Sequence, residues 1–165
     1  SMNVWFATRV GYAELDSRDP ANRKFAAVRA SHTYSGDTLD AISMYIVPKS
    51  SGDESIKRWT SWPEKGRAQW VEIDLGMQQQ VRRCSVYWFD DGAGVQVPGA
   101  WQLEVKAEDG TWQKVEIYNT DSYSVLKDAY NAVQPAGTLE TRYLRIAMKP
   151  RHDKTTVGIL AVNVE

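Results

Sequence analysis

The side chains best suited to chemistry in this 165-residue sequence are aromatic, imidazole, guanidinium and carboxylate groups in polar, turn-rich segments. They are His32, Tyr34, Trp62, Asp90, Arg151 and His152. An exposed aromatic ring packs against an apolar C–H face, and polar groups around it exchange hydrogen bonds with hydroxyls. This combination suits noncovalent binding of a sugar ring and needs no nucleophile.

Each of these residues also has a purely structural interpretation. Trp62 is either an exposed plate or a lid over one end of the fold. His32 makes either a ligand contact or a hydrogen bond within its own loop, and Asp90 either accepts from a ligand hydroxyl or braces the glycine-containing loop that follows it. Arg151 and His152 belong to a short basic run, for which solvent exposure is the commoner outcome.

The residues available for catalysis argue against an enzyme. Asp90 and Asp91 are adjacent, and neighbours in an extended chain point to opposite faces, so they do not readily flank one glycosidic bond. The sequence has two histidines and no Gly-x-Ser-x-Gly elbow. It also lacks zinc-ligand spacing and a phosphate-cradling glycine loop. We therefore expect a non-catalytic chain.

Composition narrows the class of protein further. Lys and Arg number 20 against 21 acidic residues, a balance that does not attract nucleic acid over a distance. No run approaches the roughly 20 apolar residues of a membrane helix, so a membrane is an unlikely partner. We expect one folded domain over residues 24–165, preceded over residues 1–23 by an extension or the remnant of another domain.

Period-two alternation of apolar residues predicts an all-β fold. In residues 70–75, Val71, Ile73 and Leu75 alternate with mostly polar neighbours, and Gly76 should end that strand. An Asp-Gly pair at residues 109–110 predicts a hairpin. Altogether we expect about eight short strands, the spacing of a sandwich or barrel. Those that the alternation defines cover residues 24–31, 70–75, 81–89, 101–106, 112–117, 143–148 and 158–164.

Tryptophan is unusually frequent, with seven residues. Trp59, Trp88 and Trp101 have apolar or strand-like surroundings, which favours burial in the core. Trp70 and Trp112 are expected at sheet edges or hairpins. The single cysteine, Cys84, is expected to be a small buried residue.

The order of these features resembles the F5/8 type C, or discoidin, family, which includes carbohydrate-binding module family 32. The segments that carry the resemblance are Asp40 with the two residues after it, 58–61, 70–76, 86–88, 101–105, 109–112, 143–146 and 158–160. The resemblance implies a discoidin-like jelly-roll sandwich in which a five-stranded sheet faces a three-stranded one. It also implies that ligand-binding loops gather at one end.

More narrowly, residues 30–34, 59–63 and 87–91 look like parts of modules attached to bacterial glycoside hydrolases. The resemblance then implies a secreted, periplasmic or cell-surface accessory module that binds a glycan and serves a parent hydrolase. Two alternatives remain: a structural domain that packs on its parent without binding sugar, and a module for protein or lipid surfaces. A module for protein or lipid surfaces would use residues 44–47 as an apolar spike, although such residues are more often buried.

The same resemblance implies a structural calcium ion beside an early loop, with one carboxylate from the final strand. Asp40 and Asp53, with Glu54 nearby, are the candidate ligands. The final-strand position is Ala161, which offers no oxygen from its side chain, and calcium takes about six to eight oxygen ligands. No cofactor is expected to be required.

Overall fold

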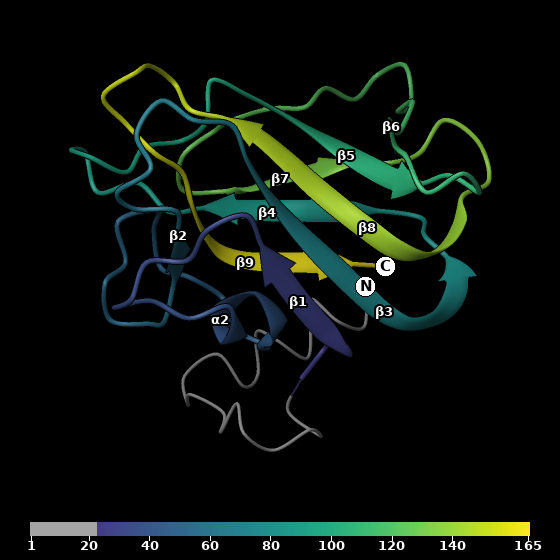
Figure 1. The fold of residues 1–165 in the computed structure, drawn as a ribbon, viewed down its shortest axis with the longest axis horizontal. Helices are drawn as coiled ribbons and strands as arrows, with labels where there is room; N and C mark the ends of the chain where they lie inside the picture. Colours follow the sequence, from purple (N-terminus) through teal and green to yellow (C-terminus); the bar gives the residue numbers. More distant parts are fainter. Residues whose placement is uncertain (1–22) are drawn as a thin grey trace.

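Two antiparallel sheets packed face to face make up the computed structural model, which describes residues 23–165 (Figure 1). The predicted all-β sandwich is therefore confirmed, while the predicted N-terminal extension lies almost wholly outside the described residues. The first sheet has five strands, in the order β1 (Ala27–Ala30), β3 (Gln69–Gln80), β8 (Glu140–Lys149), β5 (Ala100–Lys106) and β6 (Trp112–Lys114). The second has four, in the order β2 (Trp59–Thr60), β9 (Gly158–Val164), β4 (Cys84–Trp88) and β7 (Tyr130–Val133).

The second sheet has one strand more than the resemblance implied. The alternation predicted neither of its two outer strands: β2 pairs with β9, and β7 pairs with β4 from Cys84↔Val133 to Tyr87↔Tyr130. A short helix, α2 (Asp40–Ser43), was also not expected. The hairpin predicted at residues 109–110 is confirmed, because β5 and β6 pair antiparallel and Gly110 has a φ of 86°.

The first sheet corrects one predicted strand end. Gly76 has a φ of 87° but does not end β3, which continues to Gln80. The register against β8 shifts between Asp74 and Gln79, so the glycine sits in an irregularity that the strand passes through.

Between the sheets lies one core made of the inward residues of both layers. β3, β4 and β8 contribute alternate residues, as the period-two pattern predicted. Trp59, Trp88 and Trp101 are all buried, and the Trp88 and Trp101 rings meet edge to face with centroids 5.4 Å apart. Cys84 is fully buried as expected, and this burial raises the pKa of its thiol to about 12.

A smaller apolar cluster covers the outer face of the second sheet. Tyr87, Phe89, Val95, Leu160 and Ala161 form it, with Ile56, Trp62 and Tyr130 packed against them. Both faces of β4 are therefore covered, and all five of its residues are buried. Within residues 44–47, Met44 and Ile46 are buried and anchor a loop, so Val47 is the one clearly exposed apolar residue of the segment that was considered as an apolar spike.

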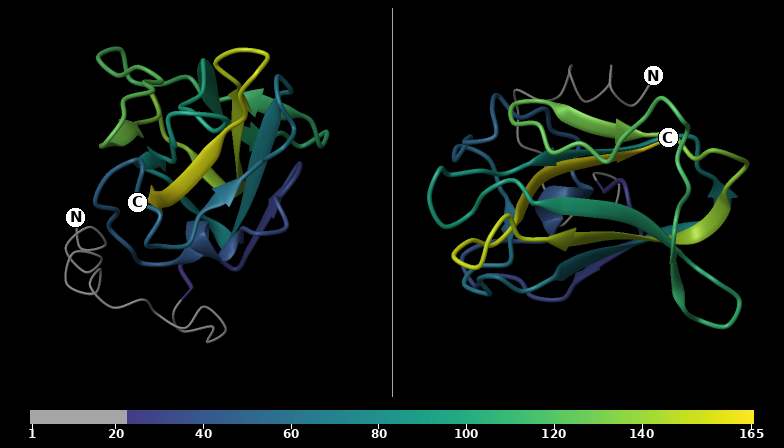
Figure 2. Two further views of the ribbon diagram at one scale, coloured as in Figure 1. Left: turned by 90° about the vertical axis from the view of Figure 1, so that its left-hand side faces the viewer. Right: turned by 90° about the horizontal axis from the view of Figure 1, so that it is seen from above.

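Four connections between the strands gather at one end of the sandwich. β1, β4 and β8 end there, and β3, β5 and β9 begin there, as the pairings Ala30↔Val71, Ala100↔Lys149 and Trp88↔Ile159 require. The loops 31–38, 61–68, 89–99 and 150–157 consequently converge on the left of Figure 1 and of the right-hand view in Figure 2. Among residues 23–165, none of the helices has the length and apolar character needed to cross a membrane.

Candidate ligand-binding cleft

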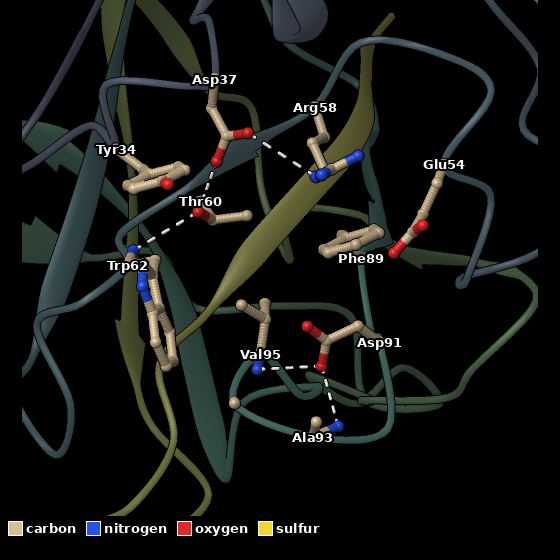
Figure 3. A pocket seen from close by; sticks show the side chains of 11 residues that line it. Tyr34, Asp37, Glu54, Arg58, Thr60, Trp62, Phe89, Asp91, Ala93 and Val95 are labelled. Atoms are coloured by element: carbon tan, nitrogen blue, oxygen red, sulfur yellow. Dashed lines mark hydrogen bonds and ion pairs between the residues drawn. The ribbon is translucent and has the colours of Figure 1, made fainter.

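An open cleft of about 320 Å³ lies at this loop end of the sandwich. Its walls come from three segments, residues 34–37, 54–62 and 89–95 (Figure 3). Small-molecule sites in proteins span roughly 300–1,000 Å³, so the cleft has room for a ligand of one or two rings. We call it the Tyr34–Trp62 cleft.

Strand periodicity explains why three of its residues face the cleft. Trp59 points into the core and is fully buried, so Arg58 and Thr60 on either side of it point the other way. In the same manner, Trp88 lies in the core and Phe89 turns toward the cleft. These contributions were not predicted from the sequence, although the alternation around each tryptophan was the signal that pointed to them.

Arg58 is held in place by a carboxylate and an aromatic ring. Its Nε lies 3.6 Å from Oδ1 of Asp37, and its guanidinium carbon is 4.8 Å from the centroid of the Phe89 ring. The Asp37 side chain is only 3% exposed and accepts a 2.5 Å hydrogen bond from the Thr60 hydroxyl. Because the Arg58 side chain is 31% exposed, its N–H groups can be reached from the cleft.

The two aromatic residues play different geometric roles. Tyr34 is 40% exposed, and its backbone N–H donates to the Thr60 carbonyl at 3.1 Å. Trp62 is half-buried: its six-membered ring packs tightly against Gly94, and the Lys65 ammonium lies 4.9 Å from the ring centroid. Tyr34 therefore offers an exposed aromatic ring to the cleft, while Trp62 forms one of its walls.

Carboxylates complete the cleft opposite the two rings (Figure 3). Glu54 is exposed there. Asp91 is exposed as well, and its Oδ1 accepts hydrogen bonds from the backbone N–H groups of Ala93 and Val95 at 2.8 and 3.1 Å. These bonds fix the loop that carries it. With Asp37, the lining holds three carboxylates against one guanidinium.

His32 supports the cleft from behind and does not line it. Its Nε2 lies 3.0 Å from the Trp62 carbonyl, and its Nδ1 lies 3.8 Å from Glu64. The carbonyl of His32 in turn accepts from the Trp59 indole at 3.1 Å. The local hydrogen bond is thus the interpretation that the geometry favours, and it positions the turn that presents Trp62.

Asp90 braces the neighbouring loop. It is 5% exposed, its Oδ1 accepts from the Gly92 N–H at 2.8 Å, and its Oδ2 accepts from the Val97 N–H at 3.0 Å. Lys127 lies 3.6 Å from Oδ1. Because Asp91 faces the cleft, its neighbour Asp90 turns inward.

Arg151 and His152 lie outside the Tyr34–Trp62 cleft, in an exposed turn after β8. The carbonyl of His152 accepts hydrogen bonds from the N–H and the hydroxyl of Thr155, both at 3.2 Å. Of the six residues predicted for the site, the structure therefore brings Tyr34 and Trp62 together, with His32 and Asp90 as supports.

The predicted calcium ligands have partners within the protein. Asp53 accepts from the N–H of Lys49 and from the N–H and hydroxyl of Ser55; burial opposes its charge, but these bonds lower its pKa below the usual range. Asp40 lies 3.6 Å from Arg23. Over the described part of the chain, no three His, Cys, Asp or Glu side chains group together in a way that could hold a metal ion. Calcium stays a prediction from the resemblance.

Comparison with known proteins places this geometry in context. The family profile of the NedA-like galactose-binding domain, of F5/8 type C, matches residues 50–146. A chain from the beta-galactosidase BgaA of Streptococcus pneumoniae is 17% identical with a TM-score of 0.70, over 92% of this chain and 97% of that one.

Two complexes share the fold as well. Chitosan-binding module 2 of a Paenibacillus sp. IK-5 chitosanase/glucanase, solved with chitotriose, is 20% identical with a TM-score of 0.58, over 87% of this chain and 97% of that one. The family 32 module of C. perfringens NanJ, solved with galactose, is 13% identical with a TM-score of 0.56, over 84% and 91%.

Proposed function

Because this chain belongs to the F5/8 type C family, as a NedA-like galactose-binding domain, we propose that it is a non-catalytic carbohydrate-binding module and that the Tyr34–Trp62 cleft holds its ligand. The observation that carries this proposal is the open cleft at the loop end, where an exposed ring stands opposite accessible charged groups. Similarly folded modules solved with galactose and with chitotriose support it.

The cleft offers each part of a sugar a matching surface. The C–H face of the ring packs on Tyr34, with Trp62 limiting how far it can slide. Arg58 donates to hydroxyl oxygens, and Glu54 and Asp91 accept from hydroxyl hydrogens. We expect dissociation constants between micromolar and millimolar, or roughly 4 to 8 kcal/mol of binding free energy.

The charges of the cleft favour neutral and amino sugars over uronic acids. Asp37, Glu54 and Asp91 outnumber Arg58 among the lining residues, and Lys65 lies only at the rim, over Trp62. Two unit charges 4 Å apart interact by about 1 kcal/mol in bulk water and about 4 kcal/mol near a protein surface. An additional carboxylate on the sugar should thus weaken binding at least several-fold.

We infer that such binding serves a glycan-degrading enzyme in a secreted, periplasmic or surface-bound protein. A weak contact of this kind keeps an attached catalytic domain near its polymer by raising the effective concentration. The alternative of a purely structural accessory domain predicts no measurable affinity for any sugar.

Calorimetric titration with galactose, chitotriose and trigalacturonate tests the proposal. The matched variants are Tyr34→Ala and Tyr118→Ala, since both tyrosines are well exposed, at 40% and 50%, and only Tyr34 lines the cleft. We expect the first to lose affinity about tenfold or more and the second to bind as the parent does. If the folded parent binds none of the three sugars at millimolar concentrations, or if Tyr34→Ala binds as well as the parent, the proposal is wrong.

A further inference from the structure

A second cleft, of about 360 Å³, lies on the outer face of the five-stranded sheet. Strand register explains its shape: Ala147 of β8 stands between Trp70 of β3 and Gln102 of β5 in one cross-strand row. The small side chain of Ala147 leaves a floor, and the larger side chains beside it form the walls. In the next row, Lys149 stands opposite Ala100. Because the Ala100 side chain is small, the cleft stays open toward the loop end of the sandwich.

The aromatic wall of this cleft is held rigidly. The Arg145 guanidinium carbon lies 4.2 Å from the ring centroid of Trp70 and 4.2 Å from that of Trp112, so the cation is stacked between two indoles. Glu72, which is buried, lies 3.7 Å from Arg145 and 2.5 Å from Arg29. A ring fixed before binding loses little conformational entropy when a ligand packs on it.

This arrangement also corrects the expectation that Trp70 packs at a sheet edge. β3 lies between β1 and β8, so Trp70 sits on the face of an interior strand, whereas Trp112 belongs to the edge strand β6 as predicted. Trp70 remains half-exposed and lines the cleft. Its ring therefore stacks on Arg145 and also borders the cleft.

The polar groups of the cleft are nearly balanced in charge. Gln102 donates from Nε2 to Oε2 of Glu104 at 2.7 Å, which leaves the Gln102 carbonyl and the second Glu104 oxygen for other partners. Lys149 is exposed at the open end. The positive charge of Arg145 already faces Glu72 and is stacked between rings, so the remaining charges, Glu104 and Lys149, offset each other.

We propose that this outer-face cleft is a second saccharide site, which takes a neutral hexopyranose with its C–H face on Trp70 and its hydroxyls on Gln102 and Glu104. The volume of about 360 Å³ fits a ligand of one or two sugar rings, whereas a protein partner buries about 800 Å² on each side of a stable interface. None of its lining residues lines the Tyr34–Trp62 cleft. The two sites together would let one chain hold a glycan at two points.

Chemical-shift mapping with methyl β-galactoside, methyl β-glucoside and methyl α-mannoside tests this site. The reporters are the Trp70 indole N–H and the Gln102 side-chain amide. Ala147→Leu fills the floor without removing a polar group, and Ala27→Leu, on β1 of the same outer face and outside this cleft, is its matched control. We expect at least one glycoside to shift both reporters in the parent and in Ala27→Leu, and to leave them unmoved in Ala147→Leu.

Two further variants make the result specific. Gln102→Ala removes a polar wall without filling the cleft and should weaken the Trp70 response about tenfold. Tyr34→Ala should leave the Trp70 response unchanged even where binding at the Tyr34–Trp62 cleft is lost, so the two proposals can fail separately. The second site is refuted if no glycoside shifts the reporters, if the shifts persist in Ala147→Leu, or if they vanish in Tyr34→Ala.

Discussion

Replacing Gly94 by alanine should push the Trp62 ring out of its place in the Tyr34–Trp62 cleft. A Cβ atom at this position would stand 2.2 Å from Cζ3 and 2.8 Å from Cη2 of Trp62. Non-bonded carbon atoms pack at about 3.5–4.0 Å. Gly94 is not among the residues with positive φ, so the backbone accepts alanine and the clash falls on the ring.

The size of the effect follows from where Trp62 lies. The ring must retreat by more than about 1 Å to restore normal contact. Overpacking usually costs about 1–3 kcal/mol, and a half-exposed ring at a rim can move outward, which places the loss of stability near 1 kcal/mol. If the ring forms one wall of the sugar site, its displacement should weaken binding about tenfold, or roughly 1.4 kcal/mol.

The assay combines chitotriose titration by calorimetry with urea unfolding of the same preparations. Gly137→Ala is the control, because a Cβ there meets nothing within 4 Å and the residue has no positive φ. The reasoning fails if Gly94→Ala retains the parent's affinity, or if Gly137→Ala loses as much. A loss of stability well above 3 kcal/mol would show instead that Trp62 is a core residue.

Three other predictions concern stability and reactivity. Burial of the Lys24 ammonium lowers its pKa from 10.5 to about 7, so between pH 7 and pH 9 the unfolded chain binds a proton that the native chain does not. The free energy of unfolding, measured with urea, should therefore rise over this range by at most about 1.4 kcal/mol per pH unit. Lys24→Met should flatten that rise, and an equal slope in the variant would contradict the prediction. Above pH 9, deprotonation of Cys84 in the unfolded chain alone should oppose this trend, since burial raises its native pKa to about 12. Asp90→Ala removes the acceptor for the Gly92 and Val97 N–H groups and should cost about 1–3 kcal/mol in the same assay, whereas an unchanged midpoint would show that the loop does not need it. The Cys84 thiol should resist iodoacetamide in the native protein and react after unfolding, and rapid native labelling would show that it is accessible.

Alternation along the chain was sufficient to predict the all-β class and most of the strands, because each strand's side chains point to opposite faces in turn; the two-layered arrangement was an expectation from the family resemblance. The buried positions of Trp59, Trp88 and Trp101 followed from their neighbours through the same alternation. The alternation of apolar residues did not predict the strand β7, because the polar Asn131 interrupts this four-residue segment. In the structure, Asn131 is buried and bonds to Val86, Ser124, Leu126 and Ala129, partners that no local pattern reveals.

For this protein, the sequence by itself determined the class of fold, the core tryptophans and two rings of the cleft, since these depend on local periodicity and residue type. Only the tertiary structure decided that Asp37, Arg58 and Glu54 join those rings, because their loops meet only once the strands are paired. It also placed Trp70 beside Ala147 and under Arg145. Strand register is set by contacts between segments about 75 residues apart, and no window of the sequence contains both.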